Sequence, residues 1–297
     1  MIHLVVTHGR DQTFQIPETE AREWQAALRF GLKRVEAPYH ADLPFSFAFY
    51  GDLWRPDTPG GAGGRGLEEA PPDTRQIQIE LARDLATAAG LSLPPEPPAN
   101  ERGLWDALAG AVTTLDNHFG LGEVILQRFL SDVAQYFSDD HLRTQVMDRV
   151  AQAIQAVNGD VVLLGHSMGS IVGYDLLSRR LELPVRALVT FGSPIGAATC
   201  RKHVANAGGE TPFPPRLPRW INLYYRQDIA TVVRLLAPYF PSGDARSVED
   251  RETLGRQAGV TDLAGGHDPL VYLSSMAMGE AIRAVVDEWL SSHPGTG

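Results

Sequence analysis

A serine between two glycines, in the segment Gly165-His166-Ser167-Met168-Gly169, is the residue best placed for chemistry in this chain. Four apolar residues at 161–164 precede the segment and an apolar helical pattern follows it, which predicts a buried strand, a sharp turn and a helix. Small neighbours allow the tight turn that lifts a serine hydroxyl clear of a sheet. We interpret the segment as a nucleophile elbow in which Ser167 attacks a carbonyl carbon. A Gly/Ser turn that only joins a strand to a helix is the alternative.

A serine hydroxyl needs a histidine to take its proton, and the histidine needs a carboxylate to hold its tautomer. In elbow architectures the order along the chain is serine, acid, histidine. Three of the nine histidines follow Ser167, namely His203, His267 and His293. His267 follows two glycines and precedes an apolar helical segment, so it is the predicted base. His203 lies in a polar segment and His293 lies near residue 297. A histidine that only caps the next helix is the alternative for His267.

Asp228 is the predicted acid. It follows an expected strand at residues 220–225, and α/β sheets place their sites at the carboxyl ends of strands. Asp262 is the second candidate, and a solvated turn aspartate is the alternative for either. Asp175 lies two turns into the helix after Ser167 and should face away from it, while Asp268 is too close to His267 in sequence to orient it easily.

Acyl transfer passes through an oxyanion that needs two amide donors. The backbone N–H of Met168, directly after the serine, is the first predicted donor. The second is expected from the loop after the first strand, where the sequence Thr-His-Gly-Arg-Asp-Gln occupies residues 7–12. Gly9 permits a close approach of the backbone there, and the N–H of Arg10 is the predicted donor.

Short apolar segments predict the strands that must position these residues. They are residues 2–6, 45–50, 161–164, 185–191, 220–225 and, with the least regular pattern, 259–263. Helical periodicity at residues 18–34 and 141–157 separates the first three segments, and an apolar helix is expected at 270–290. Alternating strands and helices predict an α/β fold with a mainly parallel sheet of about six strands, flanked by helices.

Residues 52–140 interrupt this alternation. Gly- and Pro-rich stretches flank an expected helix at 76–89, and two helices with apolar stripes are expected at 103–119 and 123–137. We therefore expect a core made of residues 1–51 and 141–297, with residues 52–140 as an insertion that forms a lid over the site. Helices that only pack on the flank of the sheet are the alternative. A lid that lines the pocket would favour an apolar acyl group or ester over a highly charged substrate.

Composition argues against several classes of function. Acidic residues outnumber basic ones by 36 to 26, the net charge is -10, and no basic block could neutralise phosphates, so no nucleic-acid partner is expected. Cys200 is the single cysteine, which permits no internal disulfide and leaves a zinc site without support. No stretch approaches the about 20 apolar residues that span a bilayer. The first residues lack a signal-peptide pattern, which predicts a cytoplasmic protein.

These features together resemble the α/β-hydrolase superfamily, in particular its bacterial serine esterase-like and lipase-like members. The similarity rests on His8-Gly9, the elbow at 165–169, the turn Phe191-Gly192-Ser193-Pro194, the strand Trp220-Ile221-Asn222 leading to Asp228, and Gly266-His267. It implies an α/β-hydrolase fold that begins at the third strand of the family. Ser193 would be a structural residue of its turn, because it lacks the second glycine of an elbow.

The resemblance implies a cofactor-independent carboxylic ester hydrolase that forms an acyl-enzyme on Ser167, with no metal, and acts on a small-molecule ester or acyl substrate. A thioesterase, amidase or peptidase would use the same Ser–Asp–His chemistry. The other alternative is a ligand-binding or sensor protein that keeps the fold without turnover. Docking on a membrane has less support, because the apolar helices lack a Lys/Arg-rich face. The oligomeric state is left open by the sequence.

Overall fold

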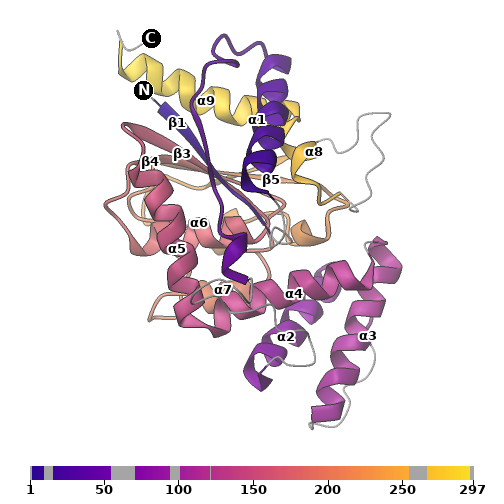
Figure 1. Cartoon of the computed structure of the whole chain (residues 1–297). Helices are drawn as coiled ribbons and strands as arrows, with labels where there is room; N and C mark the ends of the chain where they lie inside the picture. Colours follow the sequence, from indigo (N-terminus) through magenta and orange to yellow (C-terminus); the bar gives the residue numbers. More distant parts are fainter. Residues whose placement is uncertain are drawn as a thin grey trace.

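A six-stranded sheet runs through the centre of the molecule (Figure 1), and each neighbouring pair of strands is parallel. The computed structural model describes residues 2–9, 16–54, 71–93, 101–120, 122–253 and 266–294. The strands are β1 (Ile2–Thr7), β2 (Phe45–Ala48), β3 (Asp160–His166), β4 (Val185–Phe191), β5 (Arg219–Tyr224) and β6 (Val248–Glu252), in the order β2-β1-β3-β4-β5-β6. The expected α/β class, with a six-stranded parallel sheet flanked by helices, is confirmed.

Helices cover both faces of this sheet (Figure 1). One face carries α1 (Pro17–Arg34), α8 (Pro269–Leu273) and α9 (Met276–Ser292), and the other carries α5 (Asp140–Gln155), α6 (Met168–Arg179) and α7 (Ala198–Val204). Side chains alternate along a strand, so Val161 and Leu163 of β3 enter the core beside α5 and α6, whereas Val162 and Leu164 enter the core beside α1 and α9. Within the described residues, no helix is both long and apolar enough to cross a membrane.

Helix α1 touches α8 and α9 through its backbone. A Cβ atom added to Gly31 would lie 2.4 Å from the carbonyl oxygen of Leu273, and one added to Gly279 would lie 2.4 Å from that of Gly31. Real Cβ atoms do not approach other atoms this closely, so both positions require glycine. Helices near the start and the end of the chain are thereby packed tightly on the same face of the sheet.

Three further helices form a separate layer, which we call the helical unit. It consists of α2 (Pro72–Ala88), α3 (Glu101–Phe119) and α4 (Glu123–Ser138), which lie together below the sheet in Figure 1. Their apolar stripes join the core on the α5 and α6 side of the sheet. The unit is also tied to α7, since the carboxylate of Asp84 in α2 accepts a hydrogen bond of 2.5 Å from the Thr199 N–H. These helices correspond to the three expected between residues 52 and 140.

The last strand differs from the prediction. β6 is formed by the polar segment Val248–Glu252, while the predicted strand at 259–263 lies outside the described residues. β6 is an edge strand held largely by polar contacts, because Glu249 pairs with Arg219 at 2.6 Å and the Asp250 carboxylate accepts the Leu236 N–H at 2.9 Å. A prediction based on apolar runs misses such a strand.

The helix expected at 270–290 is wrong as one element, because it is divided into α8 and α9. The break lies at Ser274 and Ser275. The hydroxyl of Ser275 accepts a hydrogen bond of 3.1 Å from the N–H of Met278 and so caps α9. Apolar periodicity continues across the break, and a capping serine inside such a pattern is easily overlooked. The break limits α8 to five residues, and its N-cap Asp268 directly follows His267.

Three short 3-10 helices complete the described elements. They are Gly51–Trp54, Ile229–Thr231 and Ala237–Tyr239. The Pro-rich stretch at residues 208–218 contains no helix or strand.

Candidate active site

The turn between β3 and α6 holds Ser167 in a strained backbone conformation. Its φ of 52° and ψ of −124° lie in a region that residues with a side chain rarely adopt. A Cβ atom on Gly165 would lie 2.7 Å from the Gly169 carbonyl oxygen, and one on Gly169 would lie 2.6 Å from the His8 carbonyl oxygen. The two flanking glycines thus let the helix start directly behind the serine and against the loop after β1.

Hydrogen bonds join the side chains of Ser167, His267 and Asp228. Ser167 Oγ is 2.9 Å from His267 Nε2, and His267 Nδ1 is 2.9 Å and 3.1 Å from the two Asp228 oxygens. If Nδ1–H donates to the carboxylate, Nε2 is left unprotonated and accepts the serine hydroxyl. Ser167 and Asp228 are fully buried, while the His267 side chain is 16% exposed. The structure therefore brings together three predicted residues that lie 39 and 100 positions apart in the sequence.

Two further donors hold the Asp228 carboxylate. Asp228 follows β5, and its Oδ1 accepts the N–H of Ala230 at 2.8 Å, which caps the helix Ile229–Thr231. Its Oδ2 accepts the hydroxyl of Tyr272 at 2.7 Å. Burial, followed by the charge of Asp228, raises the pKa of Tyr272 well above its usual range, so this hydroxyl stays a donor. No pattern in the sequence pointed to Tyr272. Asp262, the second candidate for the acid, lies outside the described residues.

The loop after β1 reaches the serine. A Cβ atom on Gly9 would lie 2.6 Å from Ser167 Cβ and 3.2 Å from its Oγ, so only a glycine backbone fits there. Met168 is the first residue of α6, where amides of the first turn have no carbonyl partner within the helix. The predicted donor Met168 is thus adjacent to Ser167, and the predicted donor Arg10 lies outside the described residues.

His8 fixes the path of this loop. Its Nε2 accepts the N–H of Tyr50 at 2.9 Å, which leaves Nδ1 to donate to the Gly9 carbonyl at 2.6 Å. The Tyr50 hydroxyl donates to the carbonyl of His8 itself. Burial lowers the pKa of His8 to about 4, and the neutral tautomer satisfies both ring nitrogens. The loop backbone beside Ser167 therefore depends on a histidine that must stay uncharged.

The buried His8 should make folding stability depend on pH. Its pKa falls from 6.5 in the unfolded chain to about 4 in the fold, so the unfolded state binds more protons between these values. The stabilisation is complete above pH 6.5 and is lost as the pH falls towards 4, by about 3 kcal/mol. Urea denaturation from pH 7.5 to 4 measures this loss. His8→Gln should reduce the slope, whereas the exposed His141→Gln should leave it unchanged; equal slopes in wild type and His8→Gln would contradict the assignment.

A second buried histidine lies beside the three residues. The ring of His166 is centred 4.7 Å from that of His267 and 5.9 Å from that of Trp24. Burial, reinforced by the neighbouring His267, lowers the pKa of His166 well below its ordinary value. His166 consequently stays neutral, and it contributes to the pH dependence of folding in the same direction as His8.

A pair of serine hydroxyls supports the turn from behind. Ser170 Oγ lies 2.5 Å from the Ser167 carbonyl oxygen and 2.5 Å from Ser193 Oγ. Ser193 Oγ also accepts the N–H of Ile195 at 3.3 Å. Both hydroxyls are buried. They connect the turn after β4 to the strained backbone of Ser167.

The helical unit reaches His267 through one aromatic side chain. The ring of Phe129 in α4 is centred 6.1 Å from the His267 ring, with an angle of 71° between the planes, so one ring edge faces the other ring. Phe129 is itself buried and belongs to the core that α4 shares with the α5 and α6 side of the sheet. Part of the predicted insertion therefore packs directly on the candidate site.

Asp175 is committed to a different network, as expected from its position in α6. It is buried, and it binds the Nε atoms of Arg143 and Arg179, each at 2.6 Å. The hydroxyl of Tyr136 donates to the same carboxylate at 2.9 Å. This cluster links α4, α5 and α6.

The other residues that were not assigned to the site from the sequence also have contacts of their own. His203 stacks on Phe137 with ring centres 4.9 Å apart, and His293 stacks on Trp289. Asp268 caps α8 through the N–H of Leu270. Cys200 is buried, and burial raises the pKa of its thiol. Within the described part of the chain, no three His, Cys, Asp or Glu side chains are grouped to hold a metal ion.

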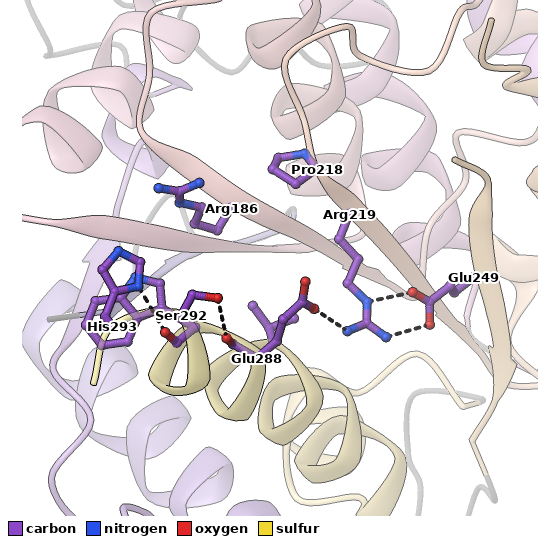
Figure 2. Close-up of a pocket in the computed structure, with 9 residues that line it drawn as sticks. Arg186, Pro218, Arg219, Glu249, Glu288, Ser292 and His293 are labelled. Carbon is purple, nitrogen blue, oxygen red and sulfur yellow. Dashed lines mark hydrogen bonds and ion pairs between the residues drawn. The ribbon is translucent and has the colours of Figure 1, made fainter. Parts of the chain in front are cut away.

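A pocket of about 470 Å³ lies at the ends of the strands away from Ser167, where β4 and β5 begin. Figure 2 shows the residues that line it. Both arginines that line it are paired with carboxylates. Arg219 contacts Glu249 at 2.6 Å and Glu288 at 3.4 Å, and Arg186 pairs with Asp160 at 2.8 Å. Ser167, His267 and Asp228 are not among the residues that line this pocket.

No protein-family model matches the chain, and a search of curated proteins finds no match. Function must therefore be inferred from the residues and their geometry.

Proposed function

We propose that this protein is a serine hydrolase with an α/β-hydrolase fold, which cleaves a carboxylic ester through an acyl-enzyme on Ser167. The observation that carries the proposal is the continuous hydrogen-bond path from Ser167 Oγ through His267 to Asp228. The positions of these residues in the fold add support, because Ser167 follows β3, Asp228 follows β5, and His267 comes after β6. This is the order of nucleophile, acid and base that the α/β-hydrolase fold uses.

In the proposed reaction, Ser167 Oγ bonds to the ester carbonyl carbon as its proton passes to His267 Nε2. Asp228 stabilises the imidazolium and keeps the ring oriented. The tetrahedral intermediate then collapses, and His267 returns the proton to the departing alcohol. A water molecule next attacks the acyl carbon and gives a proton to His267. As the bond to Ser167 Oγ breaks, His267 passes this proton to Oγ, which releases the acid and regenerates Ser167 and neutral His267.

Backbone amides would stabilise the oxyanion of both intermediates. The N–H of Met168 at the start of α6 is one proposed donor, and the positive end of the helix dipole adds to its effect. The N–H of Arg10 is the other proposed donor. The close contact between Gly9 and Ser167 supports this role for the loop, because it brings backbone next to the nucleophile.

The surroundings of His267 favour an apolar acyl or small-molecule ester as the substrate. Phe129 faces the histidine, and the helical unit that carries it has an apolar core. Such a site binds apolar groups more readily than highly charged ones. The role of the helical unit as a lid is part of this proposal. Thioesters, amides and peptides would undergo the same chemistry, and they are separated from esters by relative kcat/KM.

A fluorophosphonate probe tests the proposal directly. The folded protein should gain the mass of one adduct, and peptide mapping should locate the adduct on Ser167, because only an activated serine reacts at a useful rate. p-Nitrophenyl acetate should be hydrolysed at the same rate with and without EDTA. The absence of an adduct on folded protein would overturn the proposal and favour a ligand-binding protein that has the fold without turnover.

A further inference from the structure

A tyrosine outside the Ser–His–Asp set donates to the carboxylate that orients His267. Tyr272 lies in α8, is buried, and its hydroxyl is 2.7 Å from Asp228 Oδ2. We propose that Tyr272 is a positioning residue that controls how strongly Asp228 stabilises a protonated His267. The inference rests on the proposed function, since it concerns the charge that develops on His267 during turnover.

The hydrogen bonds to Asp228 show how this control works. Oδ1 receives the shorter contact with His267, at 2.9 Å, and the N–H of Ala230 at 2.8 Å. Oδ2 receives the Tyr272 hydroxyl at 2.7 Å and the longer contact with His267 at 3.1 Å. The tyrosine therefore draws negative charge towards Oδ2 and away from the oxygen nearer to the histidine. A buried carboxylate with fewer donors would attract an imidazolium more strongly.

One short segment supplies both the base and the tyrosine. His267 directly precedes Asp268, which caps α8, and Tyr272 lies in that helix. Residues five positions apart thus hold the same carboxylate from two directions. Movement of the segment away from Asp228 would break both contacts, and the Tyr272 bond opposes that movement.

The other side chains around His267 and Asp228 are uncharged or already hydrogen-bonded. His166 of β3 faces His267 with ring centres 4.7 Å apart, and burial keeps it neutral. Phe129 of α4 adds an apolar ring on another side. Asp268 is engaged with the N–H of Leu270. Removal of the Tyr272 hydroxyl therefore changes the charge distribution on Asp228 and leaves these neighbours in place.

Tyr272→Phe in the full chain tests the inference through the pH dependence of ester hydrolysis. With the hydroxyl gone, Asp228 holds a protonated His267 more strongly, so the acid limb of kcat/KM should move to higher pH by roughly half a unit or more. On the plateau, the stronger hold on the imidazolium raises kcat and the loss of the bond that positions the segment lowers it, so kcat should stay within about tenfold of wild type, with KM unchanged. An acid limb at the wild-type pH would overturn the inference.

Tyr136→Phe is the matched control. Tyr136 is also a buried tyrosine that donates to a buried aspartate, but its partner is Asp175. Its removal should reduce the free energy of unfolding without moving the acid limb. An equal shift in both variants would overturn the inference, because the effect would then be a general consequence of losing a buried hydroxyl.

A second substitution covers the case in which Tyr272→Phe does not fold. 3-Fluorotyrosine in place of Tyr272 keeps the hydroxyl and makes it a stronger donor, so the acid limb should move to lower pH. A shift to higher pH, or none, would overturn the inference. The fluorophosphonate adduct on the wild type separates the two proposals: without it the proposed function fails, whereas an adduct together with an unmoved limb rejects only the role of Tyr272.

Discussion

Ser167→Ala is expected to lower kcat for an activated ester by about 10⁶-fold. The substitution removes the atom that forms the acyl-enzyme, and only attack by water on a bound ester remains. The fold should persist, because alanine fits the space of serine and the strain at φ 52° applies equally to both residues. Steady-state hydrolysis of p-nitrophenyl acetate, together with circular dichroism of the variant, measures both expectations.

Ser178→Ala provides the control for this substitution. Ser178 lies near the end of α6, eleven residues and about 16 Å beyond Ser167, so its loss should leave kcat within about twofold of wild type. Residual turnover of Ser167→Ala within a hundredfold of wild type would contradict the assignment of the nucleophile. The same fall in both variants would point to damage to α6.

Asp228→Asn should lower kcat by about 10⁴-fold. An asparagine amide turns an N–H towards His267, which favours the tautomer with its proton on Nε2, and that nitrogen can no longer accept from Ser167. The carboxylate also accepts from Ala230 and Tyr272 on different oxygens, so the single oxygen of asparagine leaves one of these donors without its partner. The pH–rate profile and kcat of the purified variant give the measurement.

Asp175→Asn is the control for the acid, because Asp175 is also fully buried and hydrogen-bonded. It should lower the free energy of unfolding by breaking up the pairs with Arg143 and Arg179, while kcat stays within about tenfold of wild type. A near-normal rate for Asp228→Asn would be the contrary result, and Asp262 would then become the candidate acid.

Strands with apolar runs could be predicted from the sequence. A strand that depends on polar contacts could not. β3 (Asp160–His166) contains two valines and two leucines in succession, so both its position and its burial follow from hydrophobicity. β6 reads Val-Glu-Asp-Arg-Glu, and its pairing with β5 depends on Arg219 and Asp250 meeting partners from other segments. Such long-range polar pairing has no local pattern.

The same distinction applies to the candidate site. The motif around Ser167 and the expected order of nucleophile, acid and base along the chain were enough to select Asp228 and His267. In the structure, His267 lies within hydrogen-bond distance of both Ser167 and Asp228. The sequence contains no sign that Tyr272 reaches Asp228 or that Phe129 of α4 packs on His267. These contacts depend on the break before α9 and on how the helical unit is seated.

The glycine contact between α1 and α9 bears on how the protein is made. During synthesis α1 emerges long before α9, yet Trp24 and Leu28 of α1 share their core with Met278 and Ile282 of α9. Ile2 must also wait for Asp160 before β1 can pair with β3. A nascent chain therefore contains Ser167 long before it contains His267. The hydrogen-bonded group of Ser167, Asp228 and His267 can therefore form only after residue 267 has been synthesised, so the geometry proposed for catalysis is a late event in the synthesis of the chain.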